Sequence, residues 1–232
     1  MAIIDFHTHI LPGIDDGSRD METTRRMLEA AKEQQIDTIV ATPHFYADRM
    51  TLERFFRKRD RVLEQTRSLA AQNGIRLFSG AEVAYFHGMS TAEGLEAFCI
   101  ENTELFLLEM PFRAWTNSDV AEVSRLIERG FQIIFAHLER FYSLQEDPKI
   151  LPALLELPVL VQVNAASLLG PLFKHRGLKQ CLRGVVLLGS DCHNLSGRPE
   201  NLQAGREALA KKAGRRYLEQ SDELAQRLLG LL

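Results

Sequence analysis

The chain has 232 residues, of which 45% are hydrophobic and 25% are charged, and its formal net charge is −3. This size and hydrophobic content predict one compact domain with a full core over residues 1–232. There is no excess of Lys and Arg that would indicate nucleic acid as the main partner.

The sequence also bears on the cellular compartment. The N-terminus has neither the basic start nor the long apolar run of a signal peptide. None of the apolar stretches is long enough to span a bilayer. The three cysteines are sparse and irregularly spaced, which argues against a disulfide framework. We therefore expect a cytoplasmic protein without membrane insertion.

Short β-rich apolar segments alternate with amphipathic segments along the chain. The predicted strands lie at residues 2–6, 38–42, 76–81, 104–108, 132–136, 159–163 and 185–189. Helices are predicted at residues 21–35, 51–72 and 117–129, and residues 199–232 are expected to be helical throughout. Strands that are each followed by a helix predict a seven-stranded (β/α) barrel, one strand short of the usual number.

Several predicted strands end in side chains that can bind metals. His7 and His9 follow the first strand two residues apart, so they project to the same side of an extended chain and can chelate one ion. A histidine pair alone would more often be an ordinary core or surface feature. The adjacent aspartates at 15–16 first predict a turn, but they also offer a carboxylate ligand. Six further candidates follow later strands: His44, Glu82, Glu109, His137, Asp191 and His193.

These strand ends would converge on one face of a parallel barrel. Buried imidazoles and carboxylates in such numbers are costly without cations to pair with. The nine candidates, with Asp16 as the loop ligand, are too many for one ion and suit three. Such clusters generate hydroxide near neutral pH and bind the oxygens of an in-line phosphoryl displacement. Arg140 and Arg198 are candidate phosphate ligands, although either could instead form a surface salt bridge.

The motifs resemble the polymerase-and-histidinol-phosphatase (PHP) superfamily. They occur in order at residues 7–9 (HTH), 14–17 (IDDG), 42–44 (TPH), 80–82 (GAE), 108–111 (LEMP), 136–140 (AHLER) and 190–194 (SDCHN). Residues 11–17 and 161–168 are typical of the bacterial capsule and exopolysaccharide tyrosine phosphatases within it. The resemblance extends from residue 2 to about residue 202. It departs from the usual pattern at Leu138, where proline is common, and at Cys192, where a small residue is common.

The resemblance implies an α/β fold, a distorted seven-stranded (β/α) barrel with a metal site at the C-terminal strand ends. Three divalent ions are implied, most often manganese, although iron, zinc and cobalt compete for such sites. One ion would be held by His7, His9, Glu82 and Asp191. Glu82 would bridge to a second, completed by Glu109 and His137, and the third would be held by Asp16, His44 and His193.

The resemblance also implies a reaction and a substrate. Arg140 would bind the phosphate, with Arg198 as a weaker second ligand. A metal-bridging hydroxide would attack phosphorus in line, without a phosphoenzyme. The substrate would be phosphotyrosine on the tail of a bacterial tyrosine kinase that controls polysaccharide export. Five aromatic residues follow ligand-bearing strands and are candidates either for lining a phosphotyrosine cleft or for rim packing: Phe45, Tyr46, Tyr85, Phe86 and Phe112.

Other functions remain open from the sequence. The same metals would serve a histidinol-phosphatase-like enzyme or another phosphoesterase acting on a small molecule or nucleotide. Short connections after three of the strands favour an open cleft suited to a peptide tail. A barrel that binds a partner without catalysis would not need the full ligand set. An amidohydrolase would commonly need a bridging lysine, and no lysine occupies such a position.

A second phosphatase signature overlaps the last motif. Residues 192–198 fit the C-x5-R pattern of cysteine-dependent tyrosine phosphatases, in which a thiolate attacks phosphorus. Asp191 beside Cys192 would raise the pKa of the thiol, and the loop has a single glycine to free its amides. The pattern also leaves the other strand-end residues unexplained. We therefore favour the metal mechanism. Two histidines outside the pattern, His87 and His175, are expected at the surface or rim.

Overall fold

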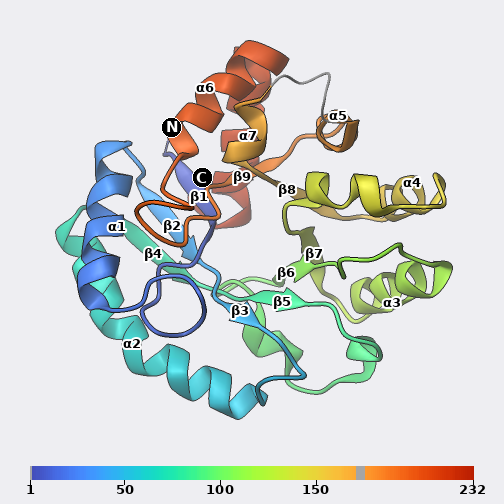
Figure 1. Ribbon diagram of the computed structural model, residues 1–232, viewed down its shortest axis with the longest axis horizontal. Helices are drawn as coiled ribbons and strands as arrows, with labels where there is room; N and C mark the ends of the chain where they lie inside the picture. Colours follow the sequence, from blue (N-terminus) through green and yellow to red (C-terminus); the bar gives the residue numbers. More distant parts are fainter. Residues whose placement is uncertain (1, 171–175) are drawn as a thin grey trace.

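The computed structural model describes residues 2–170 and 176–232, in which strands and helices alternate (Figure 1). The strands are β1 (Ile4–Thr8), β2 (Thr38–Ala41), β3 (His44–Phe45), β4 (Arg76–Ser79), β5 (Glu82–Ala84), β6 (Leu105–Glu109), β7 (Gln132–Phe135), β8 (Leu160–Asn164) and β9 (Leu187–Gly189). The α-helices are α1 (Met21–Glu33), α2 (Leu52–Gln72), α3 (Asn117–Glu128), α4 (Ile150–Leu155), α5 (Arg176–Cys181), α6 (Leu202–Ala213) and α7 (Arg215–Leu228). Short 3-10 helices are η1 (Met89–Thr91), η2 (Leu95–Phe98), η3 (Leu138–Arg140), η4 (Tyr142–Leu144) and η5 (Ala165–Leu168).

The strands form two parallel sheets that curl around one centre, with helices outside (Figure 1). One sheet has the order β1-β2-β4 and the other has the order β3-β5-β6-β7-β8-β9. Backbone hydrogen bonds join the two sheets where β1 meets the segment after β9. The Asp191 N–H donates to the His7 carbonyl at 2.8 Å, and the His9 N–H donates to the Cys192 carbonyl at 2.9 Å.

The α/β class expected from the sequence is confirmed, but the strand pattern differs from seven regular strands. The structure has a curled six-stranded sheet with a three-stranded sheet beside it. Two predicted strands end early and are each followed by a short strand that was not predicted: residues 38–42 form β2 and are followed by β3, while residues 76–81 form β4 and are followed by β5. Pro43 lies at the first break and has no N–H to donate to a ladder. The other five strands are present, with ends shifted by at most two residues.

The expectation of a helix after every strand is wrong between β5 and β6, where only η1 and η2 occur, and α4 and α5 are short. The three long predicted helices are confirmed. Asp20 caps α1 by accepting from the Thr23 N–H, and Thr51 caps α2 by accepting from the Arg54 N–H. Residues 199–232 are not helical throughout, because Gly214, with φ of 98°, separates α6 from α7.

Two apolar clusters hold this arrangement together. The larger cluster lies between the sheets and the outer helices. The smaller cluster contains Val40 of β2 and Ile134 of β7, which are not neighbouring strands, so their side chains meet inside the curl. Ala225 and Leu229, from α7 and just after it, complete this inner cluster. None of the helices within the described residues is long and apolar enough to cross a membrane.

Candidate metal centre

All nine candidate metal ligands lie together at the carboxyl ends of the strands. Three groups have one ligand atom from each member within 4.8 Å of the others: His7 with His9 and Glu82; His9 with Asp16, His44 and His193; and His44 with Glu82 and Glu109. The remaining two candidates adjoin these groups. His137 Nε2 is 2.7 Å from Glu82 Oε1, and Asp191 Oδ1 is 3.4 Å from His9 Nε2.

The end of β1 is irregular, and this irregularity brings His7 into the cluster. The pairing of β1 with β2 changes register between Asp5 and Thr8, as in a β-bulge, which redirects side chains near active sites. The buried Asp5 Oδ1 accepts from the His7 N–H at 3.1 Å and from the Ser190 N–H at 2.9 Å. Asp5 therefore fixes the end of β1 to the segment that follows β9.

Two other candidate ligands have backbone conformations that side chains rarely adopt. His137 follows β7 with φ of 32°, and Asp191 follows β9 with φ of 55°. Non-glycine residues in the left-handed region carry local strain and concentrate at functional sites. This conformation turns each chain sharply at its strand end and aims the side chain at the same centre.

Glu82 lies at the middle of the cluster and is fully buried. Its Oε2 is 3.1 Å from His7 Nε2, 3.3 Å from His9 Nε2 and 2.9 Å from His44 Nδ1. Burial alone would raise the pKa of this carboxyl, but the charge of His7 and the hydrogen bonds from His137 and other histidines hold the pKa well below its usual value. The Glu82 carboxylate thus lies close to four imidazoles, at distances that would allow it and these imidazoles to bind the same cations.

Glu109, at the end of β6, is the second buried carboxylate of this inner group. Burial and the nearby charge of Glu82 raise the pKa of Glu109 to about 7. Two carboxylates this close repel each other when both are ionised, and a divalent cation between them removes that repulsion.

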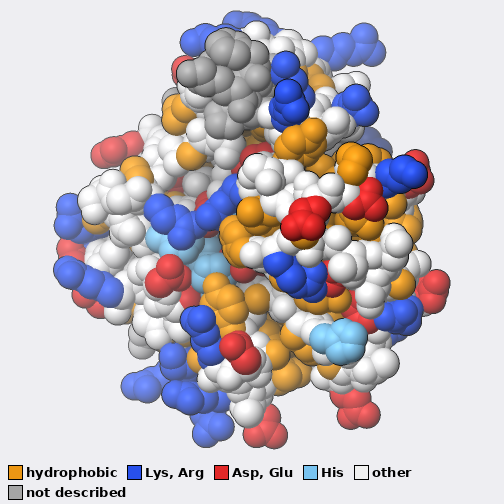
Figure 2. All heavy atoms as spheres, turned by 45° about the vertical axis from the view of Figure 1, so that its right-hand side comes forward, with side chains coloured by type: hydrophobic (Ala, Val, Ile, Leu, Met, Phe, Trp, Pro, Cys, Tyr) orange, Lys and Arg blue, Asp and Glu red, His pale blue; other side chains and the backbone are white. Residues whose placement is uncertain are grey.

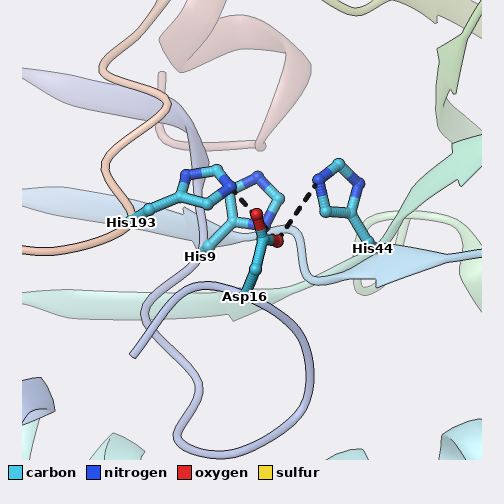
Figure 3. A group of neighbouring side chains, drawn as sticks. All are labelled: His9, Asp16, His44 and His193. Carbon is cyan, nitrogen blue, oxygen red and sulfur yellow. Dashed lines mark ion pairs between the residues drawn. The ribbon is translucent and has the colours of Figure 1, made fainter. Parts of the chain in front are cut away.

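The outer group is more exposed to solvent. His9, His44 and His193 surround Asp16, whose Oδ1 is 3.7 Å from His44 Nε2 and 3.6 Å from His193 Nε2 (Figure 3). Asp16 comes from the loop after β1, and 68% of its side chain is exposed. The remaining three members come from strand ends and are largely or fully buried. This group therefore lies nearest to the solvent.

Three residues that support the cluster were not predicted as site residues. Asp15 Oδ2 lies 2.7 Å from His9 Nδ1 and accepts from the His44 N–H at 2.8 Å. Gln162 and Asn164 alternate on β8, and Asn164 Nδ2 donates to Asp191 Oδ2 at 2.7 Å. For Gln162 and Asn164, the sequence signal was the presence of two amide side chains on one face of a buried strand.

Both predicted phosphate-binding arginines lie at the rim of the cluster. Arg198 Nη2 is 2.5 Å from Asp191 Oδ2, and Arg198 Nη1 donates to His193 Nε2 at 2.8 Å. Arg140 Nη1 is 3.7 Å from Asp191 Oδ2. About two fifths of each arginine side chain is exposed (41% for Arg140 and 40% for Arg198). Figure 2 shows histidine side chains at the bottom of a hollow, with basic side chains beside them.

The donor set fits divalent metal ions. His7 Nε2 and His9 Nε2 are 3.1 Å apart, so two ring nitrogens converge on one point. Asp191 Oδ1 is buried without a well-aligned hydrogen bond among the described residues, and His44 Nδ1 lies 2.9 Å from Glu82 Oε2 without the geometry of a hydrogen bond. Buried polar atoms are normally satisfied, and here they face other ligand atoms. Nitrogen and carboxylate oxygen donors in this mixture suit manganese, iron, zinc or cobalt.

The geometry around Cys192 does not suit a cysteine nucleophile. The thiol is buried, and burial raises its pKa well above the ordinary value, with the charge of Glu200 adding to the shift. The amides of Ser196, Gly197 and Arg198 all donate to Asn194 Oδ1, at 3.0, 2.7 and 3.1 Å. These amides are therefore not free to bind a phosphate.

Two histidines lie outside the strand-end pattern. His87 is exposed, as expected from the sequence. His175 lies outside the described residues.

Comparison with known proteins gives a consistent family assignment. A family model described as capsular polysaccharide synthesis, CpsB/CapC, matches residues 3–224. The tyrosine-protein phosphatase CpsB of Streptococcus pneumoniae is 26% identical over 227 residues, covering 91% of this chain and 91% of that protein. The tyrosine-protein phosphatase YwqE of Bacillus subtilis is 26% identical over 217 residues, covering 91% of this chain and 85% of that protein.

A solved structure agrees with these relatives. It comes from work on YwqE of Bacillus subtilis and CpsB of Streptococcus pneumoniae, described there as unique metal-dependent tyrosine phosphatases. It superimposes with a TM-score of 0.84 at 25% sequence identity, covering 99% of this chain and 95% of the other. The fold is thus that of a known structural type.

Proposed function

Because the chain belongs to the CpsB/CapC family of capsular polysaccharide synthesis, we propose that it is a metal-dependent protein-tyrosine phosphatase. The observation that carries this proposal is the convergence of nine imidazole and carboxylate side chains beneath two rim guanidinium groups. The relatives named as tyrosine phosphatases and the metal dependence described for the solved structure support it.

We propose that the cluster holds three divalent ions, with manganese as the first candidate. His7, His9, Glu82 and Asp191 would hold one, Glu82, Glu109 and His137 the second, and Asp16, His44 and His193 the third. The grouping is supported by the distances that join these side chains. The ions would supply positive charge for phosphate oxygens and an acidified water for in-line attack on phosphorus.

The protein's own groups would bind and orient the phosphate. Arg140 and Arg198 both reach the rim of the cluster, where each lies near Asp191 Oδ2. A guanidinium group can bind two phosphate oxygens at once, so each arginine can exchange its contact with Asp191 for one with the substrate. The hydrogen bond from Arg198 to His193 Nε2 must open when that nitrogen binds a metal. Arg198 would then turn toward the phosphate.

The proposed substrate is phosphotyrosine in a protein, namely the tail of a bacterial tyrosine kinase of polysaccharide export. An open hollow at the strand ends suits a flexible peptide segment (Figure 2). The three free thiols fit a cytoplasmic location. A small-molecule or nucleotide phosphoesterase on the same metals is the alternative, and the names of the relatives favour the protein substrate.

We also propose that residues 1–232 form a single domain whose two sheets act as one distorted seven-position barrel. The Gly80 N–H donates to the Ala41 carbonyl and the Glu82 N–H to the Pro43 carbonyl, at 2.9 and 3.0 Å. These bonds continue the ladder across the breaks between β2 and β3 and between β4 and β5. One apolar cluster that extends from Ile10 to Leu209 supports a single unit.

The direct test is hydrolysis of a phosphotyrosyl peptide by the purified protein. We expect release of phosphate with manganese, loss with a chelator, and recovery when manganese is restored. His137→Ala should lower kcat/KM by at least about a hundredfold, because removing a ligand disables the metal chemistry. Cys192→Ser is the matched control, and it should keep most of the activity.

The alternatives give different results in the same assay. Activity that ignores the chelator and is lost in Cys192→Ser would make the cysteine the nucleophile. Metal-dependent turnover of small phosphate esters without turnover of the peptide would keep the centre and change the substrate.

A further inference from the structure

An exposed aromatic side chain lies close to the candidate metal centre. Phe112 comes three residues after Glu109, and 58% of it is exposed. It is the one phenylalanine among the large exposed hydrophobic side chains of residues 2–170 and 176–232. An exposed phenyl ring forgoes the free energy of burial, so its position needs an explanation.

A row of stacked rings connects Phe112 to the cluster. The Phe112 ring is 4.6 Å from the ring of Phe141, which is fully buried. Phe141 in turn stacks on the candidate ligand His137, with ring centroids 5.8 Å apart and an angle of 26° between the planes. Trp115 packs against Phe141 at 5.4 Å. Phe112 is therefore held by rigid neighbours at a fixed place beside the centre.

Arg140 lies between the cluster and this ring. Its guanidinium carbon is 5.5 Å from the centre of the Phe112 ring, and its Nη1 is 3.7 Å from Asp191 Oδ2. A phosphate bound between Arg140 and the metal ligands would place its ester group next to Phe112. The leaving group, which carries the ester oxygen, would then contact the exposed Phe112 ring.

The other aromatic candidates near the centre are less free to bind a ligand. Tyr46 already packs on His44 at 5.1 Å, and Arg49 covers its ring at 4.7 Å. Tyr85 is only partly exposed, and Phe45 is buried among other phenylalanines. Phe112 is the ring that combines exposure with contact to a predicted phosphate ligand.

We infer that Phe112 is a specificity residue that stacks on the aromatic ring of an aryl phosphate and so favours phosphotyrosine over alkyl phosphates. This inference rests on the proposed function, since it places the phosphate at Arg140 and the metal ligands. Aromatic pairs in offset or edge-to-face contact gain stability beyond the burial of their surface, and an alkyl group cannot supply this contact.

The test measures binding of two non-hydrolysable ligands by calorimetry on the manganese-loaded protein. Phenylphosphonate carries the ring and methylphosphonate lacks it, while both present the same phosphonate. The wild-type protein should bind phenylphosphonate more tightly. Phe112→Leu should reduce the ratio of the two affinities by about two- to tenfold, the range given by loss of one aromatic contact. Phe112→Tyr should keep the ratio.

A matched control is Val185→Ala, which truncates an exposed apolar side chain (37% exposed) ahead of β9, at the opposite end of the strands. It should leave the ratio unchanged. An unchanged ratio in Phe112→Leu would overturn the inference, as would equal weakening of both ligands, which would mean that Phe112 only positions Arg140. Hydrolysis of the phosphotyrosyl peptide by the wild-type protein tests the proposed function separately. Failure of the inference about Phe112 can therefore be distinguished from failure of the proposed function.

Discussion

At the scale of single residues, three histidines of the centre are held in the same way. His7 Nδ1 contacts Gln162 Oε1 at 3.0 Å, His9 Nδ1 contacts Asp15 Oδ2 at 2.7 Å, and His193 Nδ1 contacts the Asp191 carbonyl at 2.9 Å. An acceptor at Nδ1 places the proton there and leaves the Nε2 lone pair for a cation. These partners fix the tautomer and the ring orientation before any ion binds.

Gln162 is the residue through which this support can be tested. Its Oε1 also accepts from the His137 N–H at 2.8 Å, so one amide holds two candidate ligands. Gln162→Leu removes both contacts at similar volume. We expect metal affinity to fall by about 10- to 100-fold, as for other residues that orient metal ligands. Titration with manganese, followed by calorimetry, measures the change.

The control for this variant is Gln180→Leu, because Gln180 is half-buried on α5 and its side chain makes no hydrogen bond to a candidate ligand among the described residues. Equal affinities in the two variants would show that Gln162 does not orient the histidines.

At the scale of elements, the centre depends on how closely β9 approaches β1. A Cβ atom added at Gly189 would lie 2.5 Å from His7 Cβ and 2.7 Å from Gln162 Nε2. Real Cβ atoms do not come this near to other heavy atoms, so only glycine fits here without displacing β1. The same close approach brings Asp191 to the His7 carbonyl.

Gly189→Ala should therefore disturb both the fold and the centre. We expect a loss of about 1–3 kcal/mol in the free energy of unfolding, typical of overpacking, together with weaker manganese binding. Gly184→Ala is the matched control, since an added Cβ there meets nothing within 4 Å. Urea unfolding of both variants gives the comparison, and equal stabilities would contradict the steric argument.

Helix α3 offers a pH-dependent test away from the metals. Asp119 Oδ2 accepts from the Thr116 N–H at 2.8 Å, and Arg113 binds both carboxylate oxygens. The hydrogen bond from Arg113 holds the pKa of Asp119 below its ordinary value. The ionised form therefore stabilises the fold above the ordinary pKa of about 4, and this contribution is lost as the pH falls through the lowered pKa.

Asp119→Asn should cost about 1–2 kcal/mol of unfolding free energy at pH 7, because it weakens the cap and the ion pair. The difference from the wild-type protein should shrink when the pH falls below about 4. Ser118→Ala, at the exposed neighbouring position, is the control and should change little. Denaturant unfolding at several pH values measures both, and a difference independent of pH would refute the assignment.

At the scale of the whole molecule, the candidate centre would couple the stability of the fold to metal binding. Glu82, Glu109 and Asp191 are largely buried carboxylates; Glu82 and Glu109 lie close together, and Asp191 adjoins the same histidines as Glu82. Cations that bind only the folded chain stabilise it by mass action. These buried negative charges therefore favour the metal-bound form of the folded protein.

Removal of metal should lower the melting temperature. Free manganese at a hundred times its dissociation constant would contribute about 2.7 kcal/mol, or a shift of roughly 5–11 °C for a chain of this size. Thermal unfolding with manganese and with a chelator measures this shift. His137→Ala should show a smaller shift, and equal shifts in both proteins would argue that the metal binds elsewhere.

The site was easier to predict from the sequence than the details of the fold. Candidate ligands such as His7 and Asp191 stand at the ends of apolar runs, and parallel strand ends must converge, so the clustering of these side chains followed from local pattern. The short strands β3 and β5 did not follow, because they are only two and three residues long and lie beyond the ends of the predicted strands. Gln162 acquires its role only through contacts with His7 and His137, which are far from it along the chain, so its partners could not be identified from the sequence.

The bond between Asp5 and Ser190 joins residues that are 185 positions apart. During synthesis, the end of β1 therefore lacks this bond until the segment after β9 has been made. A nascent chain that has released β1 through β8 from the ribosome still lacks Asp191, His193 and the clamp on β1. The candidate centre is therefore complete only after the segment that follows β9 has been synthesised, and a chain truncated before Asp191 would lack two of the nine candidate ligands.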